Sequence, residues 1–323
     1  MFFVSTPLLL AIACLFSALT IGTLIRIACL RGSSDDKSIS NQNSLKSWWG
    51  LAVALALAVI LDRTGVAILL TMAGILSLRE YLRLVGTKQV GVPTTALVYS
   101  VVPVYYLLAW YGYSDGLRTL APIFMVLVFG ALRASIGQIT DYIRTTAGMT
   151  WGLLLFVYCL SHALFLFELP MHEKPWVGEA GWFLYLVLLT EVNDISQALV
   201  GRRFGRTKLT PRISPNKSLE GLLGGFTVTI LLAILMAPWL TTFMQDRSWK
   251  VGGLFAMLSG MLIALFGFLG DINKSGIKRD VGVKDSGTLL PGQGGMMDRI
   301  DSLTFSAPVF YYFVAFILVR SQG

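Results

Sequence analysis

The stretch Ser275–Ser302, SGIKRDVGVKDSGTLLPGQGGMMDRIDS, alternates cations with carboxylates in a chain that is otherwise mostly apolar. Six glycines and one proline lie among these charges, so we expect much of the stretch to be loop rather than helix. Arg and Lys pair with phosphate oxygens, and Asp supplies oxygen ligands to Mg2+. The pattern therefore favours an anionic ligand that is held in part through a hard metal ion.

The composition is that of an integral membrane protein. The chain has 323 residues, of which 55% are hydrophobic and 14% are charged, and its mean hydropathy is +0.69. A soluble domain carries about 25% charged residues. The formal net charge of +8 is spread over short loops between apolar runs, which is how membrane topology is encoded. Because no basic, aromatic-rich domain stands outside these runs, we expect no nucleic-acid binding.

Ten apolar runs are long enough, or nearly so, to cross a membrane as helices. We therefore predict an all-α polytopic fold of about ten transmembrane helices, in which the first run is a retained helix rather than a cleaved signal peptide. Asp62, Arg63 and Thr64 separate two runs as a tight hairpin, and the polar segment 133–146 is predicted as an interfacial helix. The runs cover residues 7–30, 48–61, 65–85, 92–111, 117–132, 149–169, 181–200, 219–243, 254–269 and 303–319.

The distribution of positive charge predicts the orientation. An N-terminus outside the membrane puts most of the 26 Lys and Arg residues in cytoplasmic loops and helix ends. The stretch 275–302 then lies on the cytoplasmic side, where nucleotides are found. We treat the chain as one continuous membrane domain, with N-terminal helices over 1–190 and a C-terminal part over 191–323. Glu80 and two arginines end the third run and either face a cytoplasmic cavity or emerge into water.

The cysteines and histidines follow no known site pattern. Cys14, Cys29 and Cys159 lie in or beside apolar runs without disulfide or zinc spacing, so we interpret them as small apolar residues. His162 lies in an apolar run and His172 in a polar connection, and neither has a metal-ligand companion nearby in the sequence. We therefore expect no catalysis by histidine.

A second charged constellation covers residues 191–226, EVNDISQALVGRRFGRTKLTPRISPNKSLEGLLGGF. Asp194 lies within an apolar run, where an isolated carboxylate is costly, so we expect it to have a partner or a metal. Six cations and no acid follow over residues 202–217. They form either a solvated loop that sets the topology or part of a site for an anion.

The segment SPNKS that begins at Ser214 is predicted to open the next helix. Free backbone N–H groups at a helix N-terminus, together with Lys217, make an anion site. Ser214 or Ser218 would cap this helix start. Gly224 and Gly225 inside the helix allow close backbone approach, and we expect them to serve helix packing rather than ligand contact.

The order S-x-x-K-R-x-x-x-x-K-D-S-G-x-L-x-P-G-x-G-G-x-x-D-R-x-D-S of the quoted stretch resembles the signature of the CDP-diacylglycerol synthase (phosphatidate cytidylyltransferase) family. The resemblance begins near residue 191, where Asp194 and the Ser-Pro-x-Lys segment also match, and covers roughly the C-terminal third. One position departs, because Gln293 stands where the family usually has His. The N-terminal half shares only its hydrophobic character with the family.

The resemblance implies transfer of CMP from CTP to phosphatidate, which gives CDP-diacylglycerol and pyrophosphate for phospholipid biosynthesis. A lipid phosphate oxygen would attack the α-phosphorus of CTP, so catalysis would consist of positioning and charge neutralisation. Mg2+, alone or with a second cation, would assist. The resemblance also implies CTP, a lipid phosphate and membrane lipids as partners, a possible homodimer, and a bacterial inner membrane as the location.

The candidate residues follow from the charges and from the family motif. Asp298 and Asp301 share a helical face by their spacing. The candidate metal ligands are Asp271, Asp298 and Asp301. The candidate catalytic residues are Lys217, Asp271, Lys278, Arg279, Asp285 and Asp298. The candidate substrate-binding residues are Asp194, Ser214, Lys217, Ser275, Lys278, Arg279, Lys284, Gly292, Gln293, Gly294, Gly295 and Arg299.

Several roles stay open at this point. Asp285 either holds a metal or fixes Lys284, and each aspartate taken alone could belong to a structural ion pair. The signature glycines either let backbone amides approach the nucleotide or only form a turn. Gln293 can donate a hydrogen bond but cannot titrate as His does. We expect activity nonetheless, because phosphatidate at neutral pH already supplies an anionic oxygen.

Three alternative functions remain. The acceptor could be another lipid phosphate, such as an isoprenoid phosphate or an ether lipid. The protein could be a degenerate family member that binds without turnover, which the departure at Gln293 favours and the retained aspartates oppose. It could be a transporter, although a clustered signature on one side of the membrane differs from a midplane site.

Overall fold

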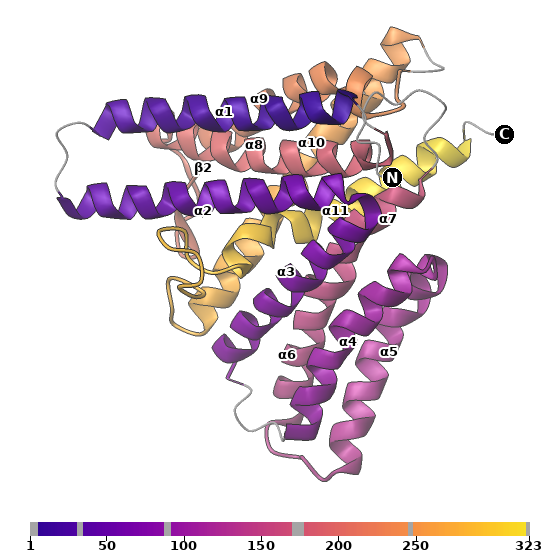
Figure 1. Ribbon diagram of the computed structural model, residues 1–323. Helices are drawn as coiled ribbons and strands as arrows, with labels where there is room; N and C mark the ends of the chain where they lie inside the picture. The colour runs from indigo at the N-terminus through magenta and orange to yellow at the C-terminus, as the bar shows by residue number, and fades with distance from the viewer. Residues whose placement is uncertain (1–5, 31–34, 87–91, 170–177, 245–247, 321–323) are drawn as a thin grey trace.

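The computed structural model describes residues 6–30, 35–86, 92–169, 178–244 and 248–320, most of which are helical (Figure 1). The helices and strands are, in chain order, α1 (Thr6–Leu30), α2 (Asp35–Ile60), α3 (Asp62–Leu84), α4 (Val92–Trp110), α5 (Ser114–Ser135), α6 (Tyr142–Leu153), α7 (Leu160–Phe165), α8 (Gly181–Phe204), β1 (Lys208–Thr210), β2 (Ser214–Ser218), α9 (Leu219–Leu240), α10 (Trp249–Asp280) and α11 (Met297–Arg320). A π-helical turn (Leu154–Cys159) joins α6 to α7, and short 3-10 turns follow α7 and precede α8.

Eight of the described helical segments are long and apolar enough to cross a membrane. They belong to α2, α3, α5, the composite helix Tyr142–Glu168, which includes α6 and α7, and α8 to α11. The described part of α4 that is apolar, Thr94–Trp110, is shorter. The all-α polytopic fold predicted from composition is therefore confirmed, whereas the number of ten helices and their orientation remain predictions.

The polar segment 133–146 is not a separate interfacial helix. α5 runs into it, and the next spanning helix already begins at Tyr142. Arg133 is fully buried and donates to the carbonyl oxygens of Thr140 and Tyr142 at 3.1 and 2.8 Å and to Thr146 Oγ1 at 3.1 Å. The polar groups of the segment therefore form hydrogen bonds that stabilise the turn between two helices, and they do not form a separate helix at the interface.

The segment SPNKS is a strand that precedes a helix, not the first turn of that helix. β1 and β2 form a small antiparallel hairpin. Glu220 closes the hairpin, because its carboxylate accepts the backbone N–H groups of Arg206 at 2.9 Å and Thr207 at 3.1 Å. α9 begins directly after β2, and Ser218 caps it by accepting the N–H of Gly221 at 3.2 Å. Of the two predicted caps, the structure uses Ser218.

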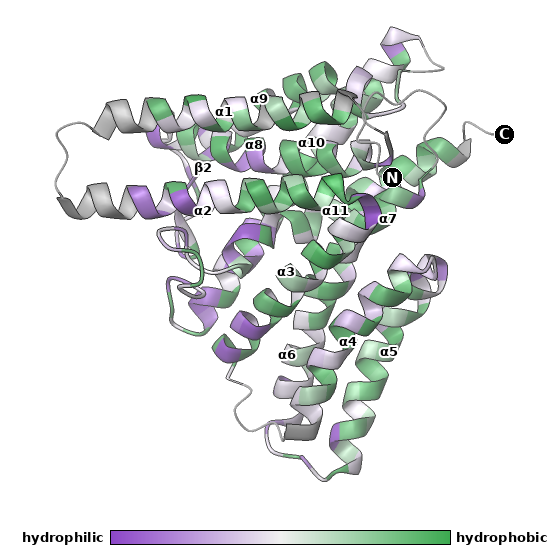
Figure 2. Ribbon diagram, viewed as in Figure 1, coloured by the Kyte–Doolittle hydropathy of each residue, from purple (hydrophilic) through white to green (hydrophobic). Residues whose placement is uncertain are grey.

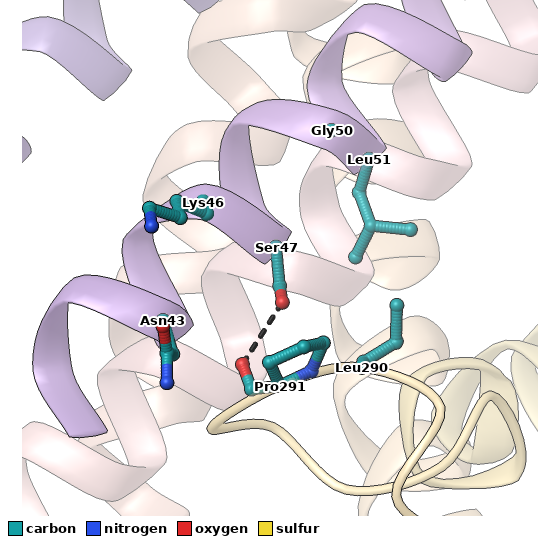
Figure 3. A pocket seen from close by; sticks show the side chains of 7 residues that line it. All are labelled: Asn43, Lys46, Ser47, Gly50, Leu51, Leu290 and Pro291. Carbon is teal, nitrogen blue, oxygen red and sulfur yellow. Dashed lines mark hydrogen bonds between the residues drawn. The ribbon is translucent and has the colours of Figure 1, made fainter. Parts of the chain in front are cut away.

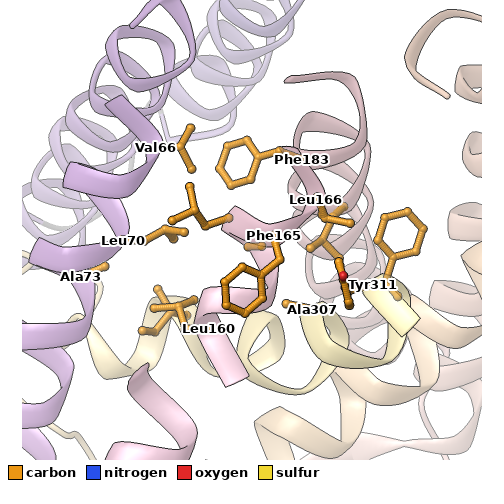
Figure 4. Close-up of a cluster of buried hydrophobic side chains, with 14 of the residues drawn as sticks. Val66, Leu70, Ala73, Leu160, Phe165, Leu166, Phe183, Ala307 and Tyr311 are labelled. Atoms are coloured by element: carbon orange, nitrogen blue, oxygen red, sulfur yellow. The ribbon is translucent and has the colours of Figure 1, made fainter. Parts of the chain in front are cut away.

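The core lies where α3, α7, α8 and α11 meet. Figure 4 shows Val66 and Leu70 of α3 facing Leu160 and Phe165 of α7, with Tyr311 of α11 beside them. These side chains are at most 5% exposed. The core therefore joins the N-terminal helices to the last helix of the chain.

The C-terminal helices approach one another closely through glycines. A side chain at Gly224 would collide with Val200, which confirms that this part of α9 is used for helix packing. A side chain at Gly270 would collide with the backbone of Asp301, so α10 and α11 are in contact at the point where both helices carry charge. This close approach positions the site.

The signature stretch is helical at both ends and loop at its centre. α10 continues into it and α11 begins within it, so that residues 281–296 form the connection. Lys278 and Arg279 in the last turn of α10, and Asp298 in the first turn of α11, suit the helix dipoles. Figure 2 shows hydrophilic residues gathered around this loop, at the adjoining end of α3 and along the first part of α2.

Candidate active site

Three aspartates and one lysine form the centre of the site. Lys274 Nζ lies 3.1 Å from Asp271 Oδ1 and 3.7 Å from Asp298 Oδ1, and it forms a short ion pair with Asp301 Oδ2. α10 presents Asp271 and Lys274 on one face, because the two are three residues apart. α11 presents the other two aspartates. The packing of α10 on α11 thus gathers three carboxylates around one ammonium group.

The signature loop is folded around Asp298. Its Oδ2 accepts hydrogen bonds from Ser286 Oγ at 2.6 Å, from Ser286 N–H at 3.3 Å and from Gly295 N–H at 3.2 Å. Its Oδ1 pairs with Lys278 Nζ at 2.8 Å. One carboxylate oxygen therefore organises the loop, while the other faces the lysines.

Lys217 reaches the cluster from β2. Its ammonium forms a short ion pair with Asp271 and lies 5.7 Å from the ring centroid of Phe268. Gly205 at the end of α8 has no side chain, and this lets the strand lie so close, because a side chain there would collide with Ser218. The hairpin thus places Lys217, which belongs to the predicted anion-binding segment, next to an aspartate of the cluster.

Asp194 is a fourth carboxylate at this cluster. It lies on α8, and its Oδ1 is buried without a hydrogen-bond partner among the described residues. Asp301, Lys217 and Asp271 are its strongest charged neighbours. The charged surroundings expected for this acid are therefore those of the cluster, and Lys217 is the cation whose charge acts on it most strongly.

Glu80 on α3 holds the start of α11. Its carboxylate oxygens accept the backbone N–H groups of Met296 at 3.0 Å and Met297 at 2.9 Å. Free N–H groups at a helix N-terminus are natural partners of a carboxylate. Of the two possibilities left open for this helix end, Glu80 faces the signature loop, whereas Arg79 and Arg83 are exposed. The sequence carries no signal for this contact, because more than two hundred residues separate the partners.

Two signature glycines are required by the packing of the protein itself. Gly294 has a positive φ of 88°, and a Cβ there would lie 2.7 Å from Asp298 Oδ2. A side chain at Gly295 would collide with Glu80 and come within 2.5 Å of Ser286 Oγ. These contacts favour a structural turn at both positions.

Gln293 and its neighbours tie the loop to α2. Gln293 Nε2 donates to the backbone oxygen of Ser44 at 2.8 Å, and Ser47 Oγ donates to the backbone oxygen of Pro291 at 2.9 Å. The Gln293 amide therefore bonds to α2 and not to the aspartates. Beside these bonds lies a cavity of about 500 Å³ (Figure 3), lined by Asn43, Lys46, Ser47, Gly50, Leu51, Leu290 and Pro291.

The other candidates lie at the margin of the cluster. Arg279 is exposed and donates through Nε to the backbone oxygen of Ile213 at 3.1 Å, which ties α10 to the turn of the hairpin. Lys284 and Asp285 are exposed on the loop. The remaining substrate candidates are either half-buried or exposed: Ser214, Ser275, Gly292 and Arg299.

The aspartates supply the type of ligand atom that a hard cation prefers, but the ammonium group of a lysine lies between them. Carboxylate oxygens are the ligands that Mg2+ prefers. In the described part of the chain, no group of three or more His, Cys, Asp or Glu side chains is arranged to hold a metal ion. The point that Asp271, Asp298 and Asp301 have in common is taken by Lys274 Nζ. The residues therefore fit Mg2+ by the chemistry of their donor atoms, while their arrangement in the structure holds an ammonium group.

Comparison with known proteins identifies the family to which the signature belongs. The profile of the Cytidylyltransferase family matches residues 42–317. The chain is 35% identical over 306 residues to YnbB, an uncharacterized protein of Escherichia coli (strain K12), which covers 95% of this chain and 98% of YnbB. It is 43% identical over 136 residues to the phosphatidate cytidylyltransferase of Haemophilus influenzae, and 45% identical over 125 residues to that of Synechocystis.

The two named enzymes match only part of the chain. Those matches cover 42% and 39% of this chain and 46% and 40% of the relatives, in the C-terminal half. The family profile, in contrast, begins on α2 and includes Glu80, so the match extends from the signature to the helices that follow α1. A nucleotidyltransferase signature set on spanning helices, together with this match over most of the chain, shows that the protein is an integral membrane enzyme of the cytidylyltransferase family.

Proposed function

We propose that the protein transfers CMP from CTP to phosphatidate, giving CDP-diacylglycerol and pyrophosphate. The single observation that carries the proposal is the cluster of three lysines and four aspartates, which α8, β2, α10 and α11 bring together at the signature. Relatives that match this part of the chain are named phosphatidate cytidylyltransferases. A lipid acceptor also suits a site built on membrane-spanning helices.

The lysines supply the charge that two anionic substrates need. Lys217, Lys274 and Lys278 are each paired with an aspartate in the structure, so their ammonium groups are held in place before a substrate arrives. A triphosphate that enters would replace carboxylates as the partner of some of these ammonium groups. Such preorganised cations act without further reorganisation when charge develops in the transition state.

The reaction itself is a displacement at phosphorus. A phosphate oxygen of the lipid forms a bond to the α-phosphorus of CTP, and the bond from that phosphorus to the oxygen bridging to the β-phosphorus breaks. Pyrophosphate leaves with that electron pair. Since the attacking oxygen is already ionised at neutral pH, no side chain has to remove a proton, and His162, which is buried among aromatic rings, has no part in the step.

Mg2+ is part of the proposal. Asp271, Asp298 and Asp301 would hold it, and when bound it would neutralise triphosphate charge and help to orient the leaving group. The loop contacts of Asp298 Oδ2 leave the Oδ1 atom of this residue for the metal and for Lys278. Relatives from bacteria lead us to place the protein in a bacterial inner membrane, with the site on the cytoplasmic side.

The test is turnover by the purified protein in detergent with CTP, phosphatidate and Mg2+. We expect CDP-diacylglycerol and pyrophosphate in equal amounts, and neither product when phosphatidate is omitted or CTP is replaced by ATP. CTP binding without product formation, followed by turnover with an isoprenoid phosphate, would instead identify a different lipid phosphate as the acceptor. Absence of both CTP binding and turnover would refute the proposed function.

A further inference from the structure

We infer that Lys274 is a built-in cation that competes with the divalent metal for the three signature aspartates. In the protein without substrate, its ammonium group holds Asp271, Asp298 and Asp301, so that a free divalent ion binds there only weakly. The aspartates become available when the ammonium group moves to another anion. The identity of that anion as a nucleotide triphosphate rests on the proposed function.

The position of the ammonium group carries the inference. Lys274 Nζ is within 4 Å of all three aspartates, whereas Lys217 and Lys278 each pair with one. The Lys274 side chain is 13% exposed and those of Asp298 and Asp301 are 7% and 6% exposed. A divalent ion that bound the same oxygens would lie a few ångströms from this ammonium group in poorly solvated surroundings. Like charges at such a distance repel strongly when solvent does not screen them.

A second observation, an aspartate without a paired cation, indicates that the cluster can take up more positive charge. Asp194 feels the charges of Asp301, Lys217 and Asp271, and its Oδ1 is buried without a hydrogen-bond partner in the described chain. The cluster therefore has four aspartates and three lysines, and Asp194 is the one of these aspartates for which the described residues form no ion pair. Because an uncompensated carboxylate in an apolar helix is costly, this excess favours uptake of a cation once Lys274 has turned to a substrate.

The side chain of Lys274 is suited to such movement. An ammonium group on a flexible four-carbon stem acts as a mobile point charge, without the fixed fork of an arginine. α10 presents Asp271, Lys274 and Lys278 on one face, so the stem of Lys274 is anchored beside the site while its end can exchange partners. Lys274 would thus alternate between the aspartates and a phosphate.

The test measures Mn2+ binding by electron paramagnetic resonance, with Mn2+ as the probe for the divalent site and no nucleotide present. We expect the wild-type protein to bind Mn2+ weakly and Lys274→Met to bind one Mn2+ at least about tenfold more tightly, because the competing charge is gone. Lys250→Met removes an exposed lysine from the other end of the same helix, and it is the matched control that should bind as the wild type does.

Lys274→Gln is the second variant, since Met could disturb folding so close to three carboxylates. Monodisperse elution in detergent shows which variants are folded. Equal Mn2+ affinity in the wild type and in the folded Lys274 variants would overturn the inference. Tight nucleotide-free binding of Mn2+ by the wild type, lost in Asp301→Asn, would overturn it without any Lys274 variant.

A third arm separates the inference from the proposed function. A CTP analogue with a methylene group between the α- and β-phosphates should let the wild type bind Mn2+ beyond the amount that the analogue holds alone. Suppose that Lys274→Met binds Mn2+ more tightly than the wild type without nucleotide, but the analogue does not increase Mn2+ binding by the wild type. This result would support Lys274 as the competing cation and contradict CTP as its alternative partner. Turnover is not needed for either readout.

Discussion

α3 carries two charged clusters at its opposite ends, and they are built differently. At its start, Arg63 pairs with Glu168 at 2.5 Å and donates to the backbone oxygen of Ala109 at 2.7 Å. Arg118 also reaches Glu168, at 3.5 Å, and its guanidinium lies 5.1 Å from the ring centroid of Tyr311. At the other end of α3, Glu80 holds the loop that surrounds the cluster of lysines and aspartates.

The difference lies in how the charges are compensated. In the first cluster, two arginines face two carboxylates, aromatic rings and a carbonyl oxygen, so the interactions join helices within the protein. In the second, lysines are paired with aspartates, so an anionic substrate can compete for the ammonium groups and a metal ion can compete for the carboxylates. The first cluster therefore joins helices within the protein, whereas the second is the one that we propose as the substrate and metal site.

Asp298→Asn should have the largest effect on activity. The amide oxygen can still accept the hydrogen bonds of the loop, but the negative charge that faces Lys274 and Lys278 is lost. We expect kcat to fall at least about 100-fold, as when other preorganised charges are removed from active sites. Turnover assays with CTP and phosphatidate measure this. Activity within a few-fold of the wild type would mean that the second cluster, too, is only structural.

Glu80→Gln should have the next largest effect. Gln has one acceptor oxygen where Glu has two, so one of the two N–H groups at the start of α11 loses its partner. Since Glu80 is a positioning residue, we expect kcat to fall about tenfold while KM for CTP changes by less than about threefold. Arg79→Gln alters the exposed neighbouring residue and is the control. A loss of thermal stability without the change in kcat would assign Glu80 a structural role only.

Glu168→Gln tests whether the first cluster stabilises the protein. It leaves Arg63 and Arg118 half-buried with a neutral partner, which should lower the free energy of unfolding by roughly 2 kcal/mol. Turnover per folded molecule should change by less than about twofold. Thermal unfolding in detergent gives the first quantity. Asp115→Asn is the matched control, because that side chain is 95% exposed and its pair with Arg118 should contribute under about 1 kcal/mol.

Gln293→His should have the smallest effect. The Gln293 amide points to Ser44 on α2, and an imidazole N–H can donate a hydrogen bond there as well. We expect turnover within about threefold of the wild type, measured over a range of pH. A gain of two orders of magnitude would show that the departure from the family pattern impairs the enzyme, and that the side chain at 293 acts on the substrate.

Much of the active site could be predicted because its residues lie in two short stretches. Lys217, Asp271, Lys278, Asp298 and Asp301 were all candidates, and the structure brings all of them together. Lys274 was not a candidate, although its spacing from Asp271 places it on the same helical face and could have identified it. Ser286 belongs to the signature, but nothing in the sequence shows that it binds Asp298.

The fold was predictable to the extent that hydropathy determines it. Long apolar runs must become helices in a membrane, since their backbone groups have no water to bond with. Local polarity was a weaker guide, because the polar segment 133–146 bonds within a turn and the segment SPNKS pairs as a strand. The charged ends of the signature stretch became helix because charge and helix dipole agree there.

Hydropathy and the signature motif are sufficient to show that this protein lies in the membrane and belongs to the cytidylyltransferase family, because both can be read from the order of residues along the chain. The position of Lys274 at the centre of the aspartates and the contact of Glu80 with the start of α11 follow only from the packing of the helices. These contacts depend on how the helices pack, and packing brings together residues that are far apart in the sequence.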